Sequence, residues 1–400
     1  MTVLFRDVRL IDGVSHEAQE HMDVRLDGER IGAVEPHAAS RAVAPGTTVV
    51  EGTGRTLLPG LIDAHAHYTF DPTEGSLQTI ARRDDETILA GARRHAALAL
   101  RAGVTTARGA GSIRGLELLL RDEIRAGRTP GPRIVAAGAA VGSVGGHGSA
   151  FGLEAAGPEG LAIVTRQVIE RGADVVKVVA SEAAMLTTTG HGPGTMVHGA
   201  PELTVDELRA AVEVAGDAGR RVMSHAQDGE SVRRSVAAGV ASVEHAWLAD
   251  EAAIQALAAS GAWLVPTLVV TDVNRTLPGL TAVQRERQDL IEIKHRASTE
   301  TAVRLGVPLA TGTDTGEVGV TADLVWREIA LLRDHGASSM TAIKAATSSG
   351  AKLLGIDDEV GSVEVRKLAD LVLVDGDPLH DLGVLARPVG VWQRGQAVTV

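Results

Sequence analysis

The sequence predicts an α/β protein, a (β/α)8 TIM barrel with a small β-sandwich domain formed by both chain termini. Between residues 58 and 355, short apolar runs alternate with amphipathic helical patterns, which is the order of parallel strands and covering helices. No glycine-rich dinucleotide fingerprint follows the first run, which disfavours a doubly wound open sheet. We expect barrel strands at 60–65, 104–107, 133–137, 175–179, 221–224, 242–244, 263–266 and 308–312.

Amphipathic patterns between these runs predict the helices of the barrel. Thr204 followed by Glu207 matches a capping box, so Thr204 is expected to begin one of them. Residues 271–299 indicate a Pro-Gly loop and then a charged helix, which is either a lid over the barrel or one of its outer helices. The predicted helices cover 84–102, 161–171, 204–218, 250–259 and 340–354.

The two ends of the chain differ from the middle. Residues 1–57 contain short strand-like runs separated by Asp-Gly and Gly-Glu turn signals. Residues 356–400 contain a further run at 369–374 and a closing Arg-Gly-Gln turn. We therefore assign 1–57 and 356–400 to one small β-sandwich domain and 58–355 to the barrel.

Composition disfavours several classes of function. The net charge of −12, from 39 basic and 51 acidic residues, argues against nucleic acid, whose binding needs a basic footprint. The chain has no cysteine, so a metal site would use histidine, carboxylate or modified lysine ligands. No apolar run is long enough to span a membrane, and the first residues lack the pattern of a signal peptide. We expect a cytoplasmic protein without a membrane partner.

Ionisable residues stand at the predicted strand ends, where the active sites of barrels lie. His65 and His67 close the first strand and share one of its faces, because alternate residues of a strand point the same way. Two such histidines alone could be chance surface residues. His225, His245 and Asp314 end the fifth, sixth and eighth strands, and the convergence of these side chains on one mouth indicates a metal site.

Lys177 lies among four valines in the fourth predicted strand. An ammonium there would be desolvated at high cost, so the plain interpretation is a buried lysine paired with a carboxylate. The other interpretation is a lysine of lowered pKa that reacts with carbon dioxide, because the resulting carbamate has two oxygens that can bridge two metal ions. The strand-end histidines and Asp314 favour the carbamate.

These residues and the motifs around them resemble the amidohydrolase superfamily over essentially the whole chain. The resemblance is to the branch of imidazolonepropionase-like enzymes, Xaa-Pro dipeptidases and Xaa-Arg/Lys carboxypeptidases. The combination of motifs in this order is highly specific. The motifs are PGLIDAHAH (59–67), GVTTAR (103–108), GGHG (145–148), VVKVVAS (175–181), SHAQ (224–227), SVEHAW (242–247), VPTL (265–268), ATGTDTG (310–316), AIKAAT (342–347) and ADLVLVDGDPL (369–379).

The resemblance implies a binuclear metal centre. One ion would be held by His65, His67 and Asp314, and the other by His225 and His245. Carboxylated Lys177 and a hydroxide would bridge the two ions, with zinc as the expected metal and manganese, cobalt or iron as alternatives.

The chemistry of such a centre follows from general principles. Two divalent ions about 3.5–4 Å apart acidify a bridging water and polarise a carbonyl. The hydroxide attacks the carbonyl carbon. Asp314 can take the proton of the water and pass it to the leaving nitrogen, as general base and then general acid.

The resemblance also points to residues that would meet the substrate. His147, in a glycine-rich loop after the third strand, would hydrogen-bond the substrate carbonyl or an end carboxylate, or it has no role. Trp247 stands near a position where relatives often carry Tyr, and Gly109 and residues 315–321 also depart from the family pattern. Trp247 is therefore expected to bind substrate in a less polar or reshaped pocket.

Three further histidines lie near the expected mouth. His191 and His198 belong to the loop 189–198 after the fourth strand, and His295 belongs to the segment 271–299. Either segment could act as a lid, although a surface loop and an outer helix are the plainer interpretations.

We expect a binuclear hydrolase that cleaves the amide bond of a small molecule such as an N-acyl amino acid or a dipeptide. A carbamate- or urea-like xenobiotic, or a cyclic amide or imine, is the alternative substrate. Mononuclear enzymes that act on cyclic amides or imines do not require a lysine at the position of Lys177. The presence of Lys177 therefore favours the binuclear amide hydrolase. A non-catalytic relative would have lost ligands, and none is lost. A homo-oligomer is expected because proteins of this type often pair with symmetry.

Overall fold

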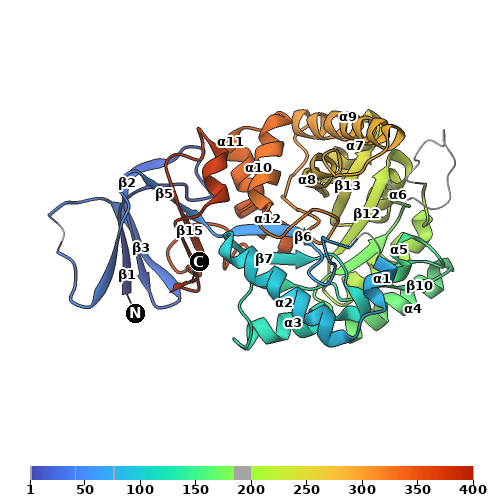
Figure 1. Cartoon of the computed structure of the whole chain (residues 1–400), viewed down its shortest axis with the longest axis horizontal. Helices are drawn as coiled ribbons and strands as arrows, with labels where there is room; N and C mark the ends of the chain where they lie inside the picture. Colours follow the sequence, from blue (N-terminus) through green and yellow to red (C-terminus); the bar gives the residue numbers. More distant parts are fainter. Residues whose placement is uncertain (1, 41, 75–76, 184–199, 400) are drawn as a thin grey trace.

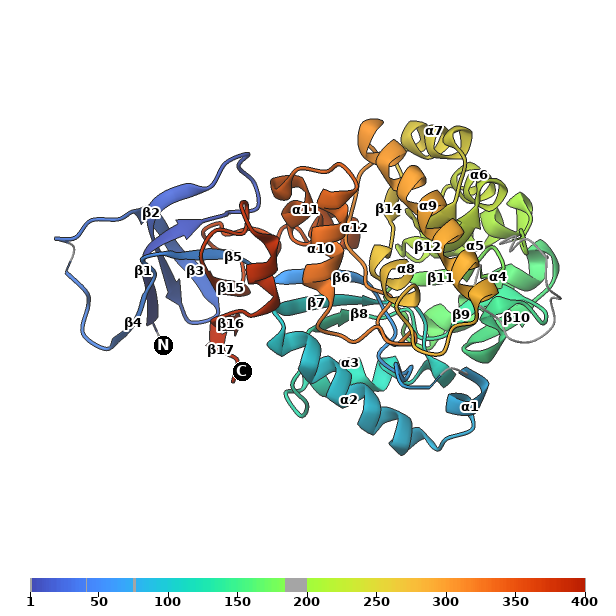
Figure 2. The same cartoon turned by 45° about the horizontal axis from the view of Figure 1, so that its top comes forward.

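The computed structural model describes residues 2–40, 42–74, 77–183 and 200–399. Parallel strands form the wall of a barrel that is surrounded by helices (Figures 1 and 2). One sheet has the order β6-β7-β8, and the other has the order β10-β9-β11-β12-β13-β14. The strands are β6 (Leu61–Ala66), β7 (Val104–Gly109), β8 (Arg133–Val135), β9 (Ala140–Ser143), β10 (Gly152–Ala155), β11 (Val176–Val179), β12 (Val222–Asp228), β13 (Ser242–Leu248) and β14 (Trp263–Val265).

Backbone hydrogen bonds close the ring between the two sheets. On one side, the amide of Asp174 donates to the carbonyl of Ala136 at 2.7 Å. On the other side, the segment predicted as the eighth strand, 308–312, lies between β14 and β6. Its Ala310 amide donates to Leu264 at 3.1 Å, and its Thr311 carbonyl accepts from Ala64 at 2.8 Å.

The eighth segment is not a regular strand, contrary to the sequence prediction. It forms a single bridge, between Leu264 and Leu309. The amide of Thr311 bonds to the carbonyl of Ala345 rather than to a neighbouring strand, and the backbone of Asp314 turns into the left-handed region with φ 58°. These two departures interrupt the ladder of hydrogen bonds between strands. The bonds of Ala310 and Thr311 to β14 and β6 still close the barrel.

The predicted helices are present, with one difference. The capping box at Thr204 and Glu207 begins α5, as predicted. The predicted helix 340–354 is two helices, because the backbone of Thr347 (φ −138°, ψ −101°) is not helical. The helices are α1 (Leu77–Ala81), α2 (Asp85–Arg101), α3 (Glu117–Arg125), α4 (Gly157–Glu170), α5 (Val205–Asp217), α6 (Gly229–Ala238), α7 (Glu251–Ser260), α8 (Leu268–Asn274), α9 (Ala282–Arg304), α10 (Val325–Asp334), α11 (Ser339–Ala345) and α12 (Ser348–Leu354).

The two chain ends build a third sheet beside the barrel, seen at the left of Figure 1. Its order is β17-β16-β15-β5-β1-β2-β3, and β4 pairs with β1. It encloses its own apolar core, to which Phe5, Leu26 and Trp392 contribute. The strands are β1 (Thr2–Leu10), β2 (Gln19–Asp27), β3 (Arg30–Pro36), β4 (Thr47–Glu51), β5 (Arg55–Pro59), β15 (Leu371–Asp375), β16 (Gly390–Gln393) and β17 (Gln396–Ala397).

Strands β5 and β15 serve two cores at once. Leu57 and Leu373 point into the core of the terminal sheet, whereas their neighbours Leu58 and Val372 belong to the core of the barrel. This is the alternation of side chains along a strand. The terminal sheet therefore packs on the barrel through a shared wall.

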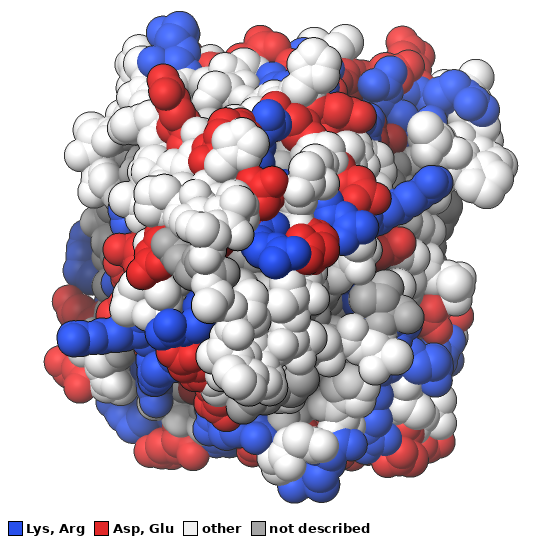
Figure 3. Space-filling view, turned by 90° about the vertical axis from the view of Figure 1, so that its left-hand side faces the viewer, with Lys and Arg blue, Asp and Glu red and all other residues white. Residues whose placement is uncertain are grey.

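The face of the terminal sheet carries charged side chains of both signs. Figure 3 shows blue and red side chains interspersed on this face, without a single large basic area among the described residues. Within the described residues, every helix is too short or too polar to cross a membrane.

Candidate active site

The predicted metal ligands come together at one mouth of the barrel. Strand β6 carries His65, and His67 directly follows it. Strand β12 carries His225 and β13 carries His245, while Asp314 follows the eighth segment. All of these side chains are buried. They line one pocket, together with Lys177 of β11 and with His147 and Trp247.

Distances within this group are short. The ring centroids of His65 and His245 lie 4.8 Å apart, and those of His225 and His245 lie 4.5 Å apart. Asp314 Oδ1 lies 3.3 Å from Nε2 of His65 and 3.2 Å from Nε2 of His67. Within the described residues, the donor atoms of His65, His245 and Asp314 are close enough to share one metal ion.

Three residues in or beside this group have unusual backbone conformations. His245, Thr267 and Asp314 have φ of 74°, 57° and 58°. The left-handed region costs about 1–2 kcal/mol for a residue with a side chain. Such strain persists where the surrounding structure imposes it, and it concentrates at functional sites.

Hydrogen bonds orient three of the imidazole rings. Nδ1 of His65 lies 2.7 Å from Glu244 Oε2, and Nδ1 of His67 lies 2.8 Å from the carbonyl of Gly111. Nδ1 of His245 lies 2.8 Å from Oγ1 of Thr267, whose hydroxyl donates to the Pro266 carbonyl. Because Nδ1 donates in each pair, Nε2 carries the lone pair, which is the tautomer of a metal-bound histidine.

Among the predicted metal ligands, two buried ring nitrogens have no hydrogen-bond partner in the described part of the chain. They are Nε2 of His65 and Nε2 of His225. A buried polar atom normally has a partner, and an imidazole lone pair is a ligand for zinc and related ions. The residues present therefore fit a bound metal.

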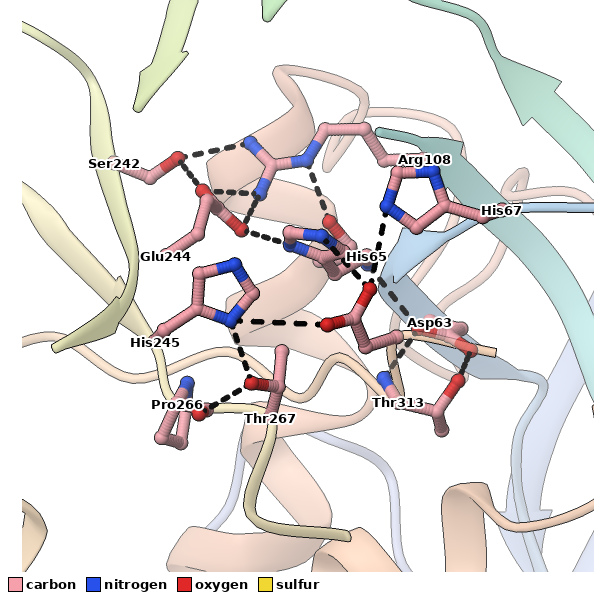
Figure 4. A network of polar contacts seen from close by, with 12 residues as sticks. Asp63, His65, His67, Arg108, Ser242, Glu244, His245, Pro266, Thr267 and Thr313 are labelled. Carbon is pink, nitrogen blue, oxygen red and sulfur yellow. Dashed lines mark hydrogen bonds and ion pairs between the residues drawn. The ribbon is translucent and has the colours of Figure 1, made fainter. Parts of the chain in front are cut away.

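A buried ion pair behind His65 was not predicted as part of the site (Figure 4). Arg108 Nη2 donates to Glu244 Oε1 at 2.9 Å, and Ser242 donates to the same oxygen at 2.5 Å. Burial opposes ionisation of Glu244, but Arg108 and His65 outweigh it and lower the pKa of Glu244 to about 2. Both residues lie inside two of the family motifs, GVTTAR and SVEHAW, and this was the signal that could have found them.

Lys177 is buried and forms no hydrogen bond or close ion pair among the described residues. Burial lowers the pKa of its ammonium to about 8, although Glu244 and Asp314 act in the opposite direction. A paired carboxylate, the plain interpretation from the sequence, is thus not seen in this part of the chain.

His147 stands beside the predicted metal ligands. It begins a short 3-10 helix, His147–Ala150, between β9 and β10, two strands that the sequence prediction missed. Its ring centroid lies 4.9 Å from that of His225. Glu202 Oε1 accepts a hydrogen bond from the His147 amide at 2.8 Å. Burial lowers the pKa of the His147 imidazole to about 4, so the ring is neutral at pH 7.

Aromatic side chains form the remaining wall of the pocket. Phe70 and Phe151 line it, and they are two of the three phenylalanines of the chain. Trp247 lines it from the other side, with its indole N–H 3.3 Å from the Pro266 carbonyl. His295 of α9 is fully buried behind Trp247, with ring centroids 5.6 Å apart.

Two segments, 189–198 and 271–299, were considered as lids over the pocket. In the segment 271–299, α9 runs along the outside of the barrel and Asn274 of α8 lines the pocket. His191 and His198 lie outside the described residues.

One departure from the family pattern has a steric explanation. A side chain at Gly109 would collide with the carboxyl group of Glu117. Glu117 is fully buried, which raises its pKa to about 8. The space beside the end of β7 is therefore already filled by an acid from α3.

The sequence comparison decides the family. Residues 56–400 match the Amidohydrolase family. The chain belongs to this family. It is 28% identical over 377 residues to the ochratoxinase of Aspergillus niger, covering 85% of this chain and 75% of that enzyme.

Solved structures agree with this assignment. The amidohydrolase superposes on a Xaa-Pro dipeptidase with methionine bound in its active site, with a TM-score of 0.89, 28% identity and full coverage of both chains. It superposes on phenylurea hydrolase B with a TM-score of 0.82 and 25% identity, over 100% of this chain and 97% of the other. The predicted barrel with a terminal β-sandwich is confirmed, and the amidohydrolase is an enzyme that hydrolyses carbon–nitrogen bonds.

Proposed function

We propose that this amidohydrolase uses two divalent metal ions to hydrolyse the amide bond of a small substrate. The observation that carries the proposal is the pair of buried, unpartnered nitrogens, Nε2 of His65 and Nε2 of His225, among the described residues. They belong to different strands and flank His245. One ion would bind His65, His67 and Asp314, and the other would bind His225 and His245.

Lys177 completes the proposed ligand set as a carbamate. Its support is a buried amine with a pKa lowered toward neutrality by burial, since the neutral amine is the form that reacts with carbon dioxide. Zinc is the metal we expect from the histidine and carboxylate donors. When bound, two such ions would acidify a water molecule and polarise the substrate carbonyl.

The side chains of this chain supply the proton transfers. Asp314 would accept a proton from the attacking water and deliver it to the leaving nitrogen. A carbon–oxygen bond forms and the carbon–nitrogen bond breaks, which releases a carboxylate and an amine. The neutral ring of His147 would donate a hydrogen bond to the substrate carbonyl.

We propose a substrate with an apolar group, such as a dipeptide or an N-acyl amino acid. The support is the wall formed by Phe70, Phe151 and Trp247, because a chain with few aromatic residues gathers three of them at one pocket. The similarity to a Xaa-Pro dipeptidase agrees with a substrate of this size and class.

A carbamate or urea is the second candidate. One observation favours it, namely that no arginine is among the described residues that line the pocket, so no guanidinium awaits the carboxylate of a peptide. Likeness to phenylurea hydrolase B is consistent with this choice.

The proposal is tested by metal analysis and a substrate screen. We expect about two metal ions per chain in the freshly purified enzyme, together with hydrolysis of dipeptides, N-acyl amino acids or aryl carbamates. Lys177→Ala should lose one or both ions and the activity, whereas Lys352→Ala, at an exposed position on α12, should retain both. A folded wild-type enzyme that takes up no metal after incubation with zinc, manganese or cobalt would contradict the proposal.

A further inference from the structure

Glu317 is an acid in the pocket that neither the proposed metal set nor the proposed proton transfers use. It follows Asp314 on the loop after the eighth segment, it is half-buried, and it lines the same pocket as His147 and Trp247. Sequence reasoning singled out the loop 315–321 as a departure from the family pattern but assigned no role to its glutamate.

The loop holds Glu317 in a fixed place. Its amide donates to the carbonyl of Asp314 at 3.2 Å, and its carbonyl accepts from the amide of Val320 at 2.8 Å. The amide of Gly316 donates in turn to the Val320 carbonyl at 3.0 Å, and Gly319 donates to Pro72 at 2.8 Å. These bonds close a tight turn and tie it to the chain beyond β6, so the carboxyl group is presented by a rigid support.

The carboxyl group of Glu317 has no hydrogen bond or ion pair with any described residue. No lysine, arginine or histidine of the described residues lies close enough to form an ion pair with it. An ionised carboxylate in a partly buried site is favoured when a cation pairs with it.

The proposed metal set does not include this acid. The ions are assigned to His65, His67, Lys177, His225, His245 and Asp314. The missing cation would therefore come with the substrate. The aromatic wall of Phe70, Phe151 and Trp247 lines the same pocket, so one ligand can meet both features.

We propose that Glu317 determines specificity by binding a protonated nitrogen of the substrate, in an amide that also carries an apolar group. This inference rests on the proposed function and narrows its substrate class. The protonated nitrogen is either a free α-ammonium group or a basic side chain, which share the same hydrogen-bonding chemistry with a carboxylate. The sequence led us to expect a less polar or reshaped pocket. The proposed role of Glu317 adds a charged contact to that pocket.

A turnover experiment separates the two sources of the charge. The first pair of substrates is phenylalanine para-nitroanilide and its N-acetyl derivative, which differ in the α-ammonium group. The second pair is N-acetyl-lysine and N-acetyl-norleucine para-nitroanilide, which differ in the side-chain ammonium. The metal-loaded wild type should prefer the charged member of one pair, and Glu317→Gln should reduce that preference about tenfold, as expected for a charge-assisted hydrogen bond.

The control is Asp323→Asn, an acid further along the same segment that does not line the pocket. It should keep the wild-type preference. If the wild type hydrolyses the anilides and Glu317→Gln leaves the preference in both pairs unchanged, the inference is overturned while the proposed function stands. If the wild type hydrolyses no amide, the proposed function fails, and the inference is decided by binding.

The binding experiment needs no turnover. Isothermal titration of the metal-loaded enzyme compares phenethylamine with phenethyl alcohol and hydrocinnamate, which share the ring and differ in charge. We expect phenethylamine to bind best and to lose about tenfold in affinity in Glu317→Gln, but not in Asp323→Asn. Melting temperatures of the variants report whether the fold is retained. Absence of phenethylamine binding to the wild type, or equal affinity in Glu317→Gln, would refute the inference.

Discussion

The buried carboxylate of Glu244 has two partners, His65 on one side and Arg108 on the other. It accepts from Nδ1 of His65 on the side of the proposed metal ligands and from Arg108 on the other side, while Ser242 also donates to it. A carboxylate can accept all of these bonds because its two oxygens offer about four lone-pair sites. The same residue therefore fixes the tautomer of His65 and compensates a buried guanidinium.

Glu244→Gln should weaken both functions. The amide NH2 would face a donor, and Arg108 would keep an uncompensated buried charge, which costs roughly 3–5 kcal/mol. We expect metal affinity to fall about 10–100-fold, the usual effect of removing a partner that orients a ligand. Chelator competition measures the affinity, and urea denaturation measures the stability.

A double variant distinguishes the two effects. Arg108→Met combined with Glu244→Gln removes the unpaired charge, so stability should recover in part while the metal affinity stays low. Wild-type metal affinity in both variants would show that the orientation of His65 does not depend on Glu244.

Sequence reasoning identified the residues at strand ends but not the residues that hold their side chains in place. His65, His225 and His245 could be predicted because barrel chemistry gathers at strand ends. Glu244 could be found only through its family motif, since the residue pattern alone does not distinguish a buried acid from an exposed one until Arg108, which is far away in the sequence, is placed beside it. Glu317 was missed for a similar reason, because its direction depends on the turn that carries it.

That turn is an element whose geometry depends on one glycine. Gly316 has φ +104°, and a Cβ there would lie 2.5 Å from the carbonyl oxygen of His67 and 2.7 Å from Cβ of Phe70. The loop from Asp314 to Val320 can therefore approach β6 closely only without a side chain at this position. Asp314 and Glu317 both depend on that approach.

Gly316→Ala should disturb the site more than an equivalent change elsewhere. Gly261, the C-cap of α7, also has a positive φ of +74°, but a Cβ at this position would have no described atom within 4 Å. Gly261→Ala should cost about 1–2 kcal/mol of stability from its conformation alone and leave kcat/KM unchanged. Gly316→Ala should cost more and lower kcat/KM, because His67 or Asp314 must move. Equal stability and full activity of both variants would contradict this account.

The regular elements were predictable where the pattern was long, and not where the chain was short or rich in glycine. Apolar runs identified β6, β11 and β12, and a capping box identified the start of α5. Strands β9 and β10 are four residues each, too short for alternation to distinguish them from a loop. The eighth segment reads as a strand by composition, but its hydrogen bonds are divided among β14, β6 and Ala345.

At the scale of the whole molecule, the barrel and the terminal sheet are joined by more than apolar contact. Arg133 of β8 pairs with Asp370, at 3.0 Å, in a place where the Asp370 side chain is 2% exposed. Asp370 also accepts from the amide of Arg394 at 2.7 Å. One carboxylate therefore connects a barrel strand to the C-terminal strands. Together with the shared wall of β5 and β15, it leads us to propose that the two parts unfold as one unit.

Asp370→Asn tests this coupling. Arg133 would remain charged and largely buried, so we expect a loss of about 3 kcal/mol, the lower end for breaking a buried pair because Arg133 keeps some contact with water. Asp375→Asn is the matched control on β15, since its bond with Arg55 lies at an exposed position and should be worth less than about 1 kcal/mol. Hydrogen exchange should show β7 and β8 losing protection together with β15 and β16 in Asp370→Asn alone. If the terminal strands lost protection while the barrel strands kept theirs, the two parts would be independent units joined by a dispensable contact.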